Sequence, residues 1–248
     1  MRRLISIYDR SGHWPYYYFQ NGWDVINWDI YFNLDINIIK DAETALDLFE
    51  DVHGILAAPP CTDFTISGAQ YWKQKDEDGR TQNSLEFVYQ VQRLASLFTP
   101  TDPDYPYNFF WAVENPVGRL PKLIPDLGKP MYFQPWEYAG WLNLSDNDLF
   151  ELDRIRKKDG KGITKREALH IINCNAYTKK TGLWGEFNHN LKKKPIEPVK
   201  GSPQGSPFQR FGGKSDKTKS IRSQTPLGFS KAFYNANSSL YKEEELIF

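Results

Sequence analysis

Residues 53–61 read HGILAAPPC, an apolar run that ends in two prolines and a cysteine. The apolar residues 53–58 predict a buried β-strand, because a short run of this kind bounded by turn residues is typical of a strand in a covered sheet. Pro59 and Pro60 restrict the backbone and can hold the Cys61 thiol in a fixed loop at the edge of the sheet. A thiolate at that position is a candidate nucleophile, whereas a single cysteine with no further signal is more commonly an inert packing residue.

Segments on both sides of this stretch alternate between strand-like and helix-like patterns. Residues 4–8, 23–28 and 109–113 are further short apolar runs, and residues 42–49 have helical spacing. The clearest amphipathic helix is residues 81–98, where apolar side chains recur at three-residue spacing: Leu85, Val88, Val91, Leu94 and Leu97. Strands that alternate with helices predict an α/β fold, in which crossover helices cover a mainly parallel sheet.

Polar or reactive residues stand at or just beyond the ends of four predicted strands: Asp9, Asp29, Cys61 and Glu114. The ligands of open α/β sheets gather at the carboxyl ends of the strands. A carboxylate that ends a buried apolar strand, as Glu114 does, is costly unless it is paired or functional. A nucleophilic cysteine beside a partly desolvated carboxylic acid suits attack on a heteroaromatic ring that is coupled to protonation of the ring.

Three motifs in order along the chain resemble those of the cytosine-5 DNA methyltransferases. Residues 56–65 (LAAPPCTDFT) resemble the Pro-Cys catalytic loop of that family, and residues 113–116 (VENP) resemble its Glu-Asn-Val motif. Residues 222–226 (RSQTP) resemble its late Arg-x-x-Thr-Pro motif. The resemblance implies a Rossmann-like methyltransferase fold with a small, loop-rich basic recognition region. It also implies S-adenosylmethionine as cofactor and a cytosine flipped out of double-stranded DNA as substrate. Compact phage and prophage members of the family are the nearest comparison.

The resemblance also implies a role for each matching catalytic residue. Cys61 would attack C6 of cytosine, while Glu114 would contact N3 and the exocyclic amine and so place electron density on C5. Asn115 would hold the catalytic loop. Restriction protection and regulation are both known uses of such methylation, and the sequence does not choose between them.

Further residues match cofactor-binding or DNA-binding positions of the family. Asp9, Ser11 and Gly12 fall in its first loop, Asp29 matches the acidic residue that binds the ribose hydroxyls, and Asp41 matches a contact to the adenine amine. Pro59 is assigned to the same pocket. The expected contacts to nucleic acid are Thr65, Lys179, Lys180, Arg222 and Thr225.

The sequence departs from the family pattern in three places. The first loop has one glycine, Gly12, where the family has two. The Gln-x-Arg-x-Arg motif is missing, and residues 177–184 (YTKKTGLW) stand at about its place and could supply cations. The closing Gly-Asn-Val motif is not found either.

Charge divides the chain into two unlike parts. Residues 1–150 contain 11 Lys and Arg against 21 Asp and Glu, whereas residues 151–248 contain 20 against 10. The basic part suits a polyanion such as DNA. We expect a catalytic core over residues 1–144, a helical insertion over 145–173, a short basic recognition region over 174–221 and a segment returning to the core over 222–248.

Composition excludes several other classes of protein. No apolar run approaches the ~18 residues of a spanning helix, and the amino terminus is typical of a first strand rather than a signal peptide, so we expect a cytoplasmic protein. Cys61 and Cys174 are too few for a disulfide framework, and the four histidines lack metal-ligand spacing, so no metal is expected. Trp72 and Trp184 are the aromatic residues with the best claim to contact a base or the cofactor.

Two other functions remain open at this level. The chain could be a methyltransferase-like protein that has lost cofactor binding and only holds nucleic acid, as the imperfect first loop suggests. It could also use Cys61 on a free pyrimidine nucleotide. The DNA sequence that is recognised and the oligomeric state cannot be derived from the residues.

Overall fold

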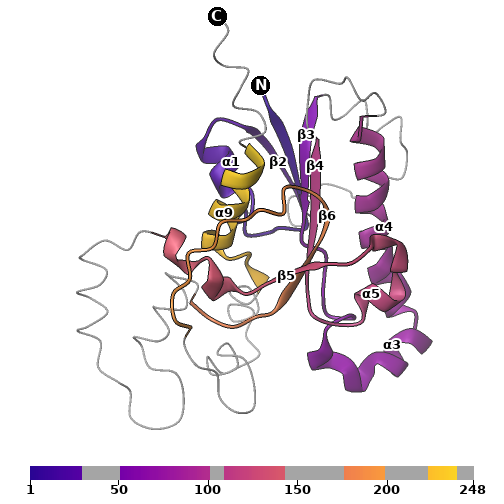
Figure 1. Cartoon of the computed structure of the whole chain (residues 1–248). Coiled ribbons are helices and arrows are strands. Elements are labelled where there is room, and N and C mark those ends of the chain that lie inside the picture. Colours follow the sequence, from indigo (N-terminus) through magenta and orange to yellow (C-terminus); the bar gives the residue numbers. More distant parts are fainter. Residues whose placement is uncertain (30–50, 101–108, 143–175, 199–222, 239–248) are drawn as a thin grey trace, which may run out of the picture.

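The computed structural model describes residues 1–29, 51–100, 109–142, 176–198 and 223–238 (Figure 1). Its centre is a six-stranded sheet of order β2-β1-β3-β4-β6-β5. The strands are β1 (Arg3–Ile7), β2 (Asp24–Trp28), β3 (Val52–Ala57), β4 (Phe110–Pro116), β5 (Met131–Phe133) and β6 (Thr181–Glu186). The first four strands are parallel, and β6 runs antiparallel to both β4 and β5. This mostly parallel sheet confirms the α/β class.

Helices cover both faces of the sheet (Figure 1). The α-helices are α1 (Tyr16–Gln20), α3 (Trp72–Glu77), α4 (Arg80–Phe98), α5 (Leu120–Leu123) and α9 (Leu227–Ser238). Short 3-10 helices are η3 (Ile66–Tyr71), η4 (Pro125–Leu127), η5 (Pro135–Glu137) and η6 (Ala139–Trp141). Helices α1 and α9 lie on one face, and α3, α4 and α5 lie on the other.

Alternation along the strands assigns the core residues to these two faces. On β3, Leu56 packs in the cluster that includes Phe229 and Phe233 of α9. Its neighbours Ile55 and Ala57 pack in the cluster that includes residues of α4. The strand is therefore apolar on both sides, as the run of residues 53–58 predicted.

The predicted amphipathic helix is confirmed as α4. Leu85, Val88, Val91 and Leu94 are buried, and Leu97 is partly buried against the same core. The helix begins after Gly79, whose φ of 80° lies in the left-handed region that glycine adopts without strain. On the opposite face, α9 buries Phe229, Ala232 and Phe233.

Two predicted boundaries differ from the structure. Strand β4 does not end at Val113, because Glu114, Asn115 and Pro116 pair with Leu183, Gly182 and Thr181 of β6. Strand β6 in turn belongs to the central sheet, although the predicted division placed it in a separate recognition region. The sequence pattern did not predict β6, because Gly182 and Gly185 interrupt its apolar residues and two lysines precede it.

Some predictions lie outside the described residues: the helix over 42–49, the insertion over 145–173, Asp41, Cys174 and Arg222. Among the helices that are described, none has both the length and the apolar composition needed to cross a membrane.

Candidate active site

The carboxyl ends of the four parallel strands meet at one edge of the sheet. The chain passes from β1 to β2 on one side and then to β3 on the other, so the strand order reverses between β1 and β3. Such a switch point is where open α/β sheets bind ligands. Asp9 follows β1, and the Pro59-Pro60-Cys61 loop follows β3. The topology therefore brings the loop after β1 and the loop after β3 to the same edge of the sheet.

The loop that carries Cys61 turns tightly and is tied to β4. The Cys61 carbonyl accepts hydrogen bonds from the backbone N–H groups of Phe64 (3.0 Å) and Thr65 (3.1 Å), and the cysteine is half-buried. The fully buried Asn115 donates from Nδ2 to the Pro59 carbonyl at 3.2 Å. This bond joins the end of β4 to the turn before Cys61, which is the arrangement that the role expected of Asn115 requires.

Glu114 lies on β4, beside the start of the Cys61 loop. The register pairs Val113 with Ala57 of β3, so Glu114 is level with Ala58, three residues before Cys61. Its carboxyl group is buried, with 5% of the residue exposed. Among the described residues Glu114 forms an ion pair with Lys179, whose Nζ lies 3.7 Å from Oε1.

Burial dominates the protonation of Glu114. Loss of hydration raises the pKa of its carboxyl group, Lys179 opposes the rise, and the Asp9 carboxylate adds to it. Within the described part of the chain Oε1 has no hydrogen-bond partner. The carboxyl group therefore keeps its proton to a higher pH than an exposed glutamate does, and among the described residues Oε1 is left for a ligand, as a proton donor to a ring nitrogen requires.

Asp9 organises the first loop. Its carboxylate accepts hydrogen bonds from Ser11 N (3.2 Å), Ser11 Oγ (2.6 Å) and Trp14 N (2.9 Å). The Gly12 N–H donates to the Asp9 carbonyl at 3.0 Å, and Gly12 has a φ of 64°, which explains the glycine. Both carboxylate oxygens of Asp9 are therefore engaged within the loop.

Other polar groups near this loop fit a bound cofactor. The buried Asn27 Oδ1 on β2 has no hydrogen-bond partner among the described residues, and Asn27 Nδ2 lies 3.5 Å from where a side chain on Gly12 would begin. Asp29, at the end of β2, is 6% exposed. An acceptor without a partner next to a buried carboxylate suits the hydroxyl and amine donors of a nucleoside.

The residues expected to contact nucleic acid occupy different environments. Lys180 is exposed, with Nζ 4.4 Å from the centre of the Tyr132 ring. Thr65 is half-buried at the start of η3, and Lys179 is turned toward Glu114. Thr225 is only 1% exposed, so it occupies an interior position rather than the surface position of a DNA contact.

Thr225 instead lies beside the first loop. The His13 ring forms a hydrogen bond with the backbone of Thr225, and burial lowers the pKa of His13. The segment that resembles the Arg-x-x-Thr-Pro motif therefore supports the loop after β1 before the chain enters α9.

The two tryptophans expected to contact a base or the cofactor occupy different environments. Trp184 is buried in the core with Phe64 and Leu85, and Trp72 is covered by the Arg119 guanidinium 4.9 Å from its ring centre.

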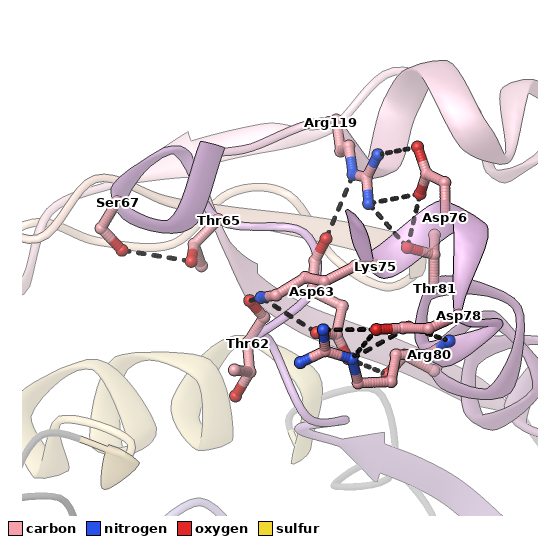
Figure 2. A network of polar contacts seen from close by, with 11 residues as sticks. Thr62, Asp63, Thr65, Ser67, Lys75, Asp76, Asp78, Arg80, Thr81 and Arg119 are labelled. Atoms are coloured by element: carbon pink, nitrogen blue, oxygen red, sulfur yellow. Dashed lines mark hydrogen bonds and ion pairs between the residues drawn. The ribbon is translucent and has the colours of Figure 1, made fainter. Parts of the chain in front are cut away.

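Sequence reasoning missed the charged residues that surround the Cys61 loop. Asp63, Lys75 and Arg119 form a network of hydrogen bonds and ion pairs around it (Figure 2). Their separation in sequence hides the network, because no local pattern links a loop residue to a lysine 12 positions on and an arginine 56 positions on. The described residues contain no group of three or more histidine, cysteine or acidic side chains arranged to hold a metal ion.

A scan against protein-family models finds no family that matches this chain, and a search of curated proteins finds no matching sequence.

Proposed function

We propose that this chain is a DNA methyltransferase that transfers a methyl group from S-adenosylmethionine to C5 of a flipped cytosine through a covalent adduct with Cys61. The observation that carries the proposal is the placement of Cys61 and Glu114. They stand at the carboxyl ends of adjacent parallel strands, where burial raises the pKa of Glu114 and Asn115 ties the cysteine loop to β4.

The proposed reaction begins with addition of the Cys61 thiolate to C6 of the ring. As the S–C6 bond forms, the carboxyl proton of Glu114 passes to N3, which keeps the ring neutral and leaves C5 nucleophilic. When bound, S-adenosylmethionine would supply the electrophilic methyl group that C5 takes. A water molecule then accepts the C5 proton, the Cys61 thiolate is expelled and the N3 proton returns to Glu114, which restores the aromatic base.

The first loop and the end of β2 are the proposed cofactor site. Asp29 would bind the ribose hydroxyls, and Asn27, whose Nδ2 lies near Gly12, offers as an acceptor the Oδ1 atom that has no partner among the described residues. Asp9 would act indirectly, since its carboxylate oxygens hold the loop backbone. The sulfonium centre is cationic, and the acidic first 150 residues provide a favourable field for it.

Bisulfite sequencing of DNA from cells that express the chain tests this function and reports the recognised sequence. Methylated cytosines in a defined sequence context are expected with the wild type and not with Cys61→Ala, and Cys174→Ser serves as a control for general effects of removing a thiol. An unmethylated genome would count against the proposal. Turnover of dCMP or dUMP without DNA would favour the reading in which the substrate is a free nucleotide.

One observation favours a second candidate, a nucleic-acid-binding protein without cofactor. The Asp9 carboxylate is fully engaged within a loop that has a single glycine, so the loop offers less backbone for close approach of a ligand. Calorimetry with S-adenosylmethionine separates the two functions. Saturable binding that Asp29→Asn weakens supports the methyltransferase, and no heat of binding supports the second candidate.

A further inference from the structure

The segment just after Cys61 is held by two buried cations from different elements (Figure 2). Lys75 of α3 is 5% exposed, and its Nζ donates to the Thr62 carbonyl at 2.6 Å and pairs with Asp63 Oδ1 at 3.0 Å. Ser84 Oγ of α4 donates to the other oxygen of Asp63 at 2.6 Å. The Asp63 side chain is thus clamped between α3 and α4.

Arg119, which follows β4, holds the next peptide group. It is 8% exposed, and its Nε donates to the Asp63 carbonyl at 3.1 Å. The rest of the guanidinium bonds to Asp76 Oδ2 (2.8 Å) and Thr81 Oγ1 (2.7 Å), so it is fixed to the junction of α3 and α4. Two consecutive carbonyls, those of Thr62 and Asp63, therefore each accept a hydrogen bond from a buried cation.

Backbone contacts fix the other side of the same segment. Arg119 N donates to the Phe64 carbonyl at 2.9 Å, and Ile66 N donates to the Val117 carbonyl at 3.3 Å. Gly118 forms a bridge with Thr65, and a side chain on Gly118 would begin 1.9 Å from the Phe64 carbonyl oxygen. Residues 64–66 after Cys61 therefore form backbone hydrogen bonds with residues 117–119 after Glu114.

Burial of lysine and arginine is costly unless each cation is paired and hydrogen-bonded. By contrast, the ion pair of Lys73 with Glu77, also on α3, is exposed. We infer that Lys75 and Arg119 are positioning residues that latch residues 62–64 and so set the position of the Cys61 thiol relative to Glu114. The consequence for catalysis rests on the proposed function, whereas the latch itself does not.

Amide hydrogen exchange and thiol alkylation test the latch in the absence of any substrate. In a Cys174→Ser background, so that iodoacetamide reports on Cys61 alone, Lys75→Met is expected to speed both exchange at residues 64–66 and alkylation of Cys61 about tenfold. Lys75→Arg keeps the charge and should recover much of the protection. Glu77→Gln is the matched control, because it alters an exposed ion pair on the same helix, and it should leave both rates unchanged.

Exchange within α4 reports whether each variant is folded. If Lys75→Met also loses protection in α4, Asp63→Asn is the second variant, since it keeps the shape of the side chain and removes its charge. Unchanged exchange at residues 64–66 in a folded Lys75→Met or Asp63→Asn chain would overturn the latch. An effect of Glu77→Gln as large as that of Lys75→Met would do the same.

The catalytic consequence is tested with S-adenosylmethionine and DNA that contains 5-fluorocytosine. In this base fluorine replaces the C5 proton whose removal releases the enzyme, so the adduct is trapped. Lys75→Met should slow adduct formation about 100-fold with little change in DNA affinity, because the thiol is misplaced rather than removed. An unchanged rate in a variant that has lost loop protection would overturn the positioning role. No adduct in the wild type would refute the proposed function and leave the exchange result standing.

Discussion

Glu114 and Cys61 differ in how their surroundings prepare them for chemistry. Glu114 is buried in the sheet, and burial raises the pKa of its carboxyl group despite Lys179 at 3.7 Å. Cys61 is half-buried on a loop whose position depends on contacts from three other segments. The sheet therefore sets the environment of the proposed acid, and the loop sets the position of the proposed nucleophile.

The raised pKa of Glu114 predicts a pH-dependent stability cost. The unfolded chain releases the Glu114 proton near the ordinary glutamate pKa of about 4.3, whereas the folded chain keeps it to a higher pH. The free energy of unfolding therefore falls as pH rises between these two pKa values. Glu114→Gln removes this titration. Its melting temperature relative to the wild type should therefore increase as pH rises from 4 to 8.

The same variant should lose activity while it gains stability. Because glutamine cannot transfer a proton to N3, methyl transfer by Glu114→Gln is expected to fall at least about 100-fold. Glu137→Gln is a control. The Glu137 carboxylate belongs to η5 and forms an ion pair with Lys193, with 2.6 Å between Lys193 Nζ and Glu137 Oε1. A melting temperature that differs from the wild type by the same amount at every pH would contradict the titration argument.

Sequence alone placed three candidate residues at strand ends, because the signal for each is local. Asp9, Cys61 and Glu114 each end an apolar run, so their meeting at one sheet edge follows from parallel strands. Lys75 and Arg119 carry no such signal, because a buried cation and an exposed one look alike in a sequence until their partners are known.

At the scale of elements, apolar periodicity was sufficient for α4 and for the parallel strands, whose side chains pack on both faces. It was insufficient for β6, which contains Gly182 and Gly185. A side chain on Gly182 would begin 2.6 Å from the Trp184 ring, and one on Gly185 would begin 2.2 Å from the Trp111 carbonyl oxygen. The glycines that obscure the strand in the sequence are thus the residues that allow it to fit between β4 and β5.

Gly118 permits a comparable close approach between the segment after β4 and the loop after β3. Gly118→Ala should destabilise the chain by about 1–3 kcal/mol, because the new Cβ meets backbone atoms that cannot turn aside. Denaturant unfolding measures the loss, and hydrogen exchange should place it at residues 61–66.

Gly22→Ala is the comparison for the Gly118 variant. Gly22 has a φ of 78°, but a Cβ added there would meet no atom within 4 Å, so its substitution costs only backbone strain and should leave exchange in the loop unchanged. Equal loop exchange in the two variants would contradict the close packing of the loop on Gly118.

Over the whole molecule, the balance of 31 basic and 31 acidic residues conceals an acidic first part and a basic second part. The acidic part carries the strand ends of the candidate site, and the described cations of the basic part include Lys179, Lys180 and Lys192 to Lys194. This division suits an enzyme that binds a cationic cofactor on one part and a polyanion on the other.

The charge division predicts different salt dependence for the two ligands. Affinity for DNA should fall steeply with salt, by a slope of about 0.9 in log–log units for each phosphate neutralised, whereas affinity for S-adenosylmethionine should change little. Fluorescence anisotropy and calorimetry over the same salt series measure the two. A DNA affinity that does not change with salt would contradict the assignment of the basic part.

The central claim is that Cys61 attacks the base while Glu114 protonates it, and trapping the adduct tests it most directly. The purified chain is incubated with S-adenosylmethionine and DNA that contains 5-fluorocytosine, and the products are resolved by intact mass spectrometry. A covalent complex with the mass of protein, DNA and one methyl group is predicted for the wild type and for Cys174→Ser, and none for Cys61→Ala. Absence of the complex across diverse DNA sequences, or its persistence in Cys61→Ala, would contradict the claim.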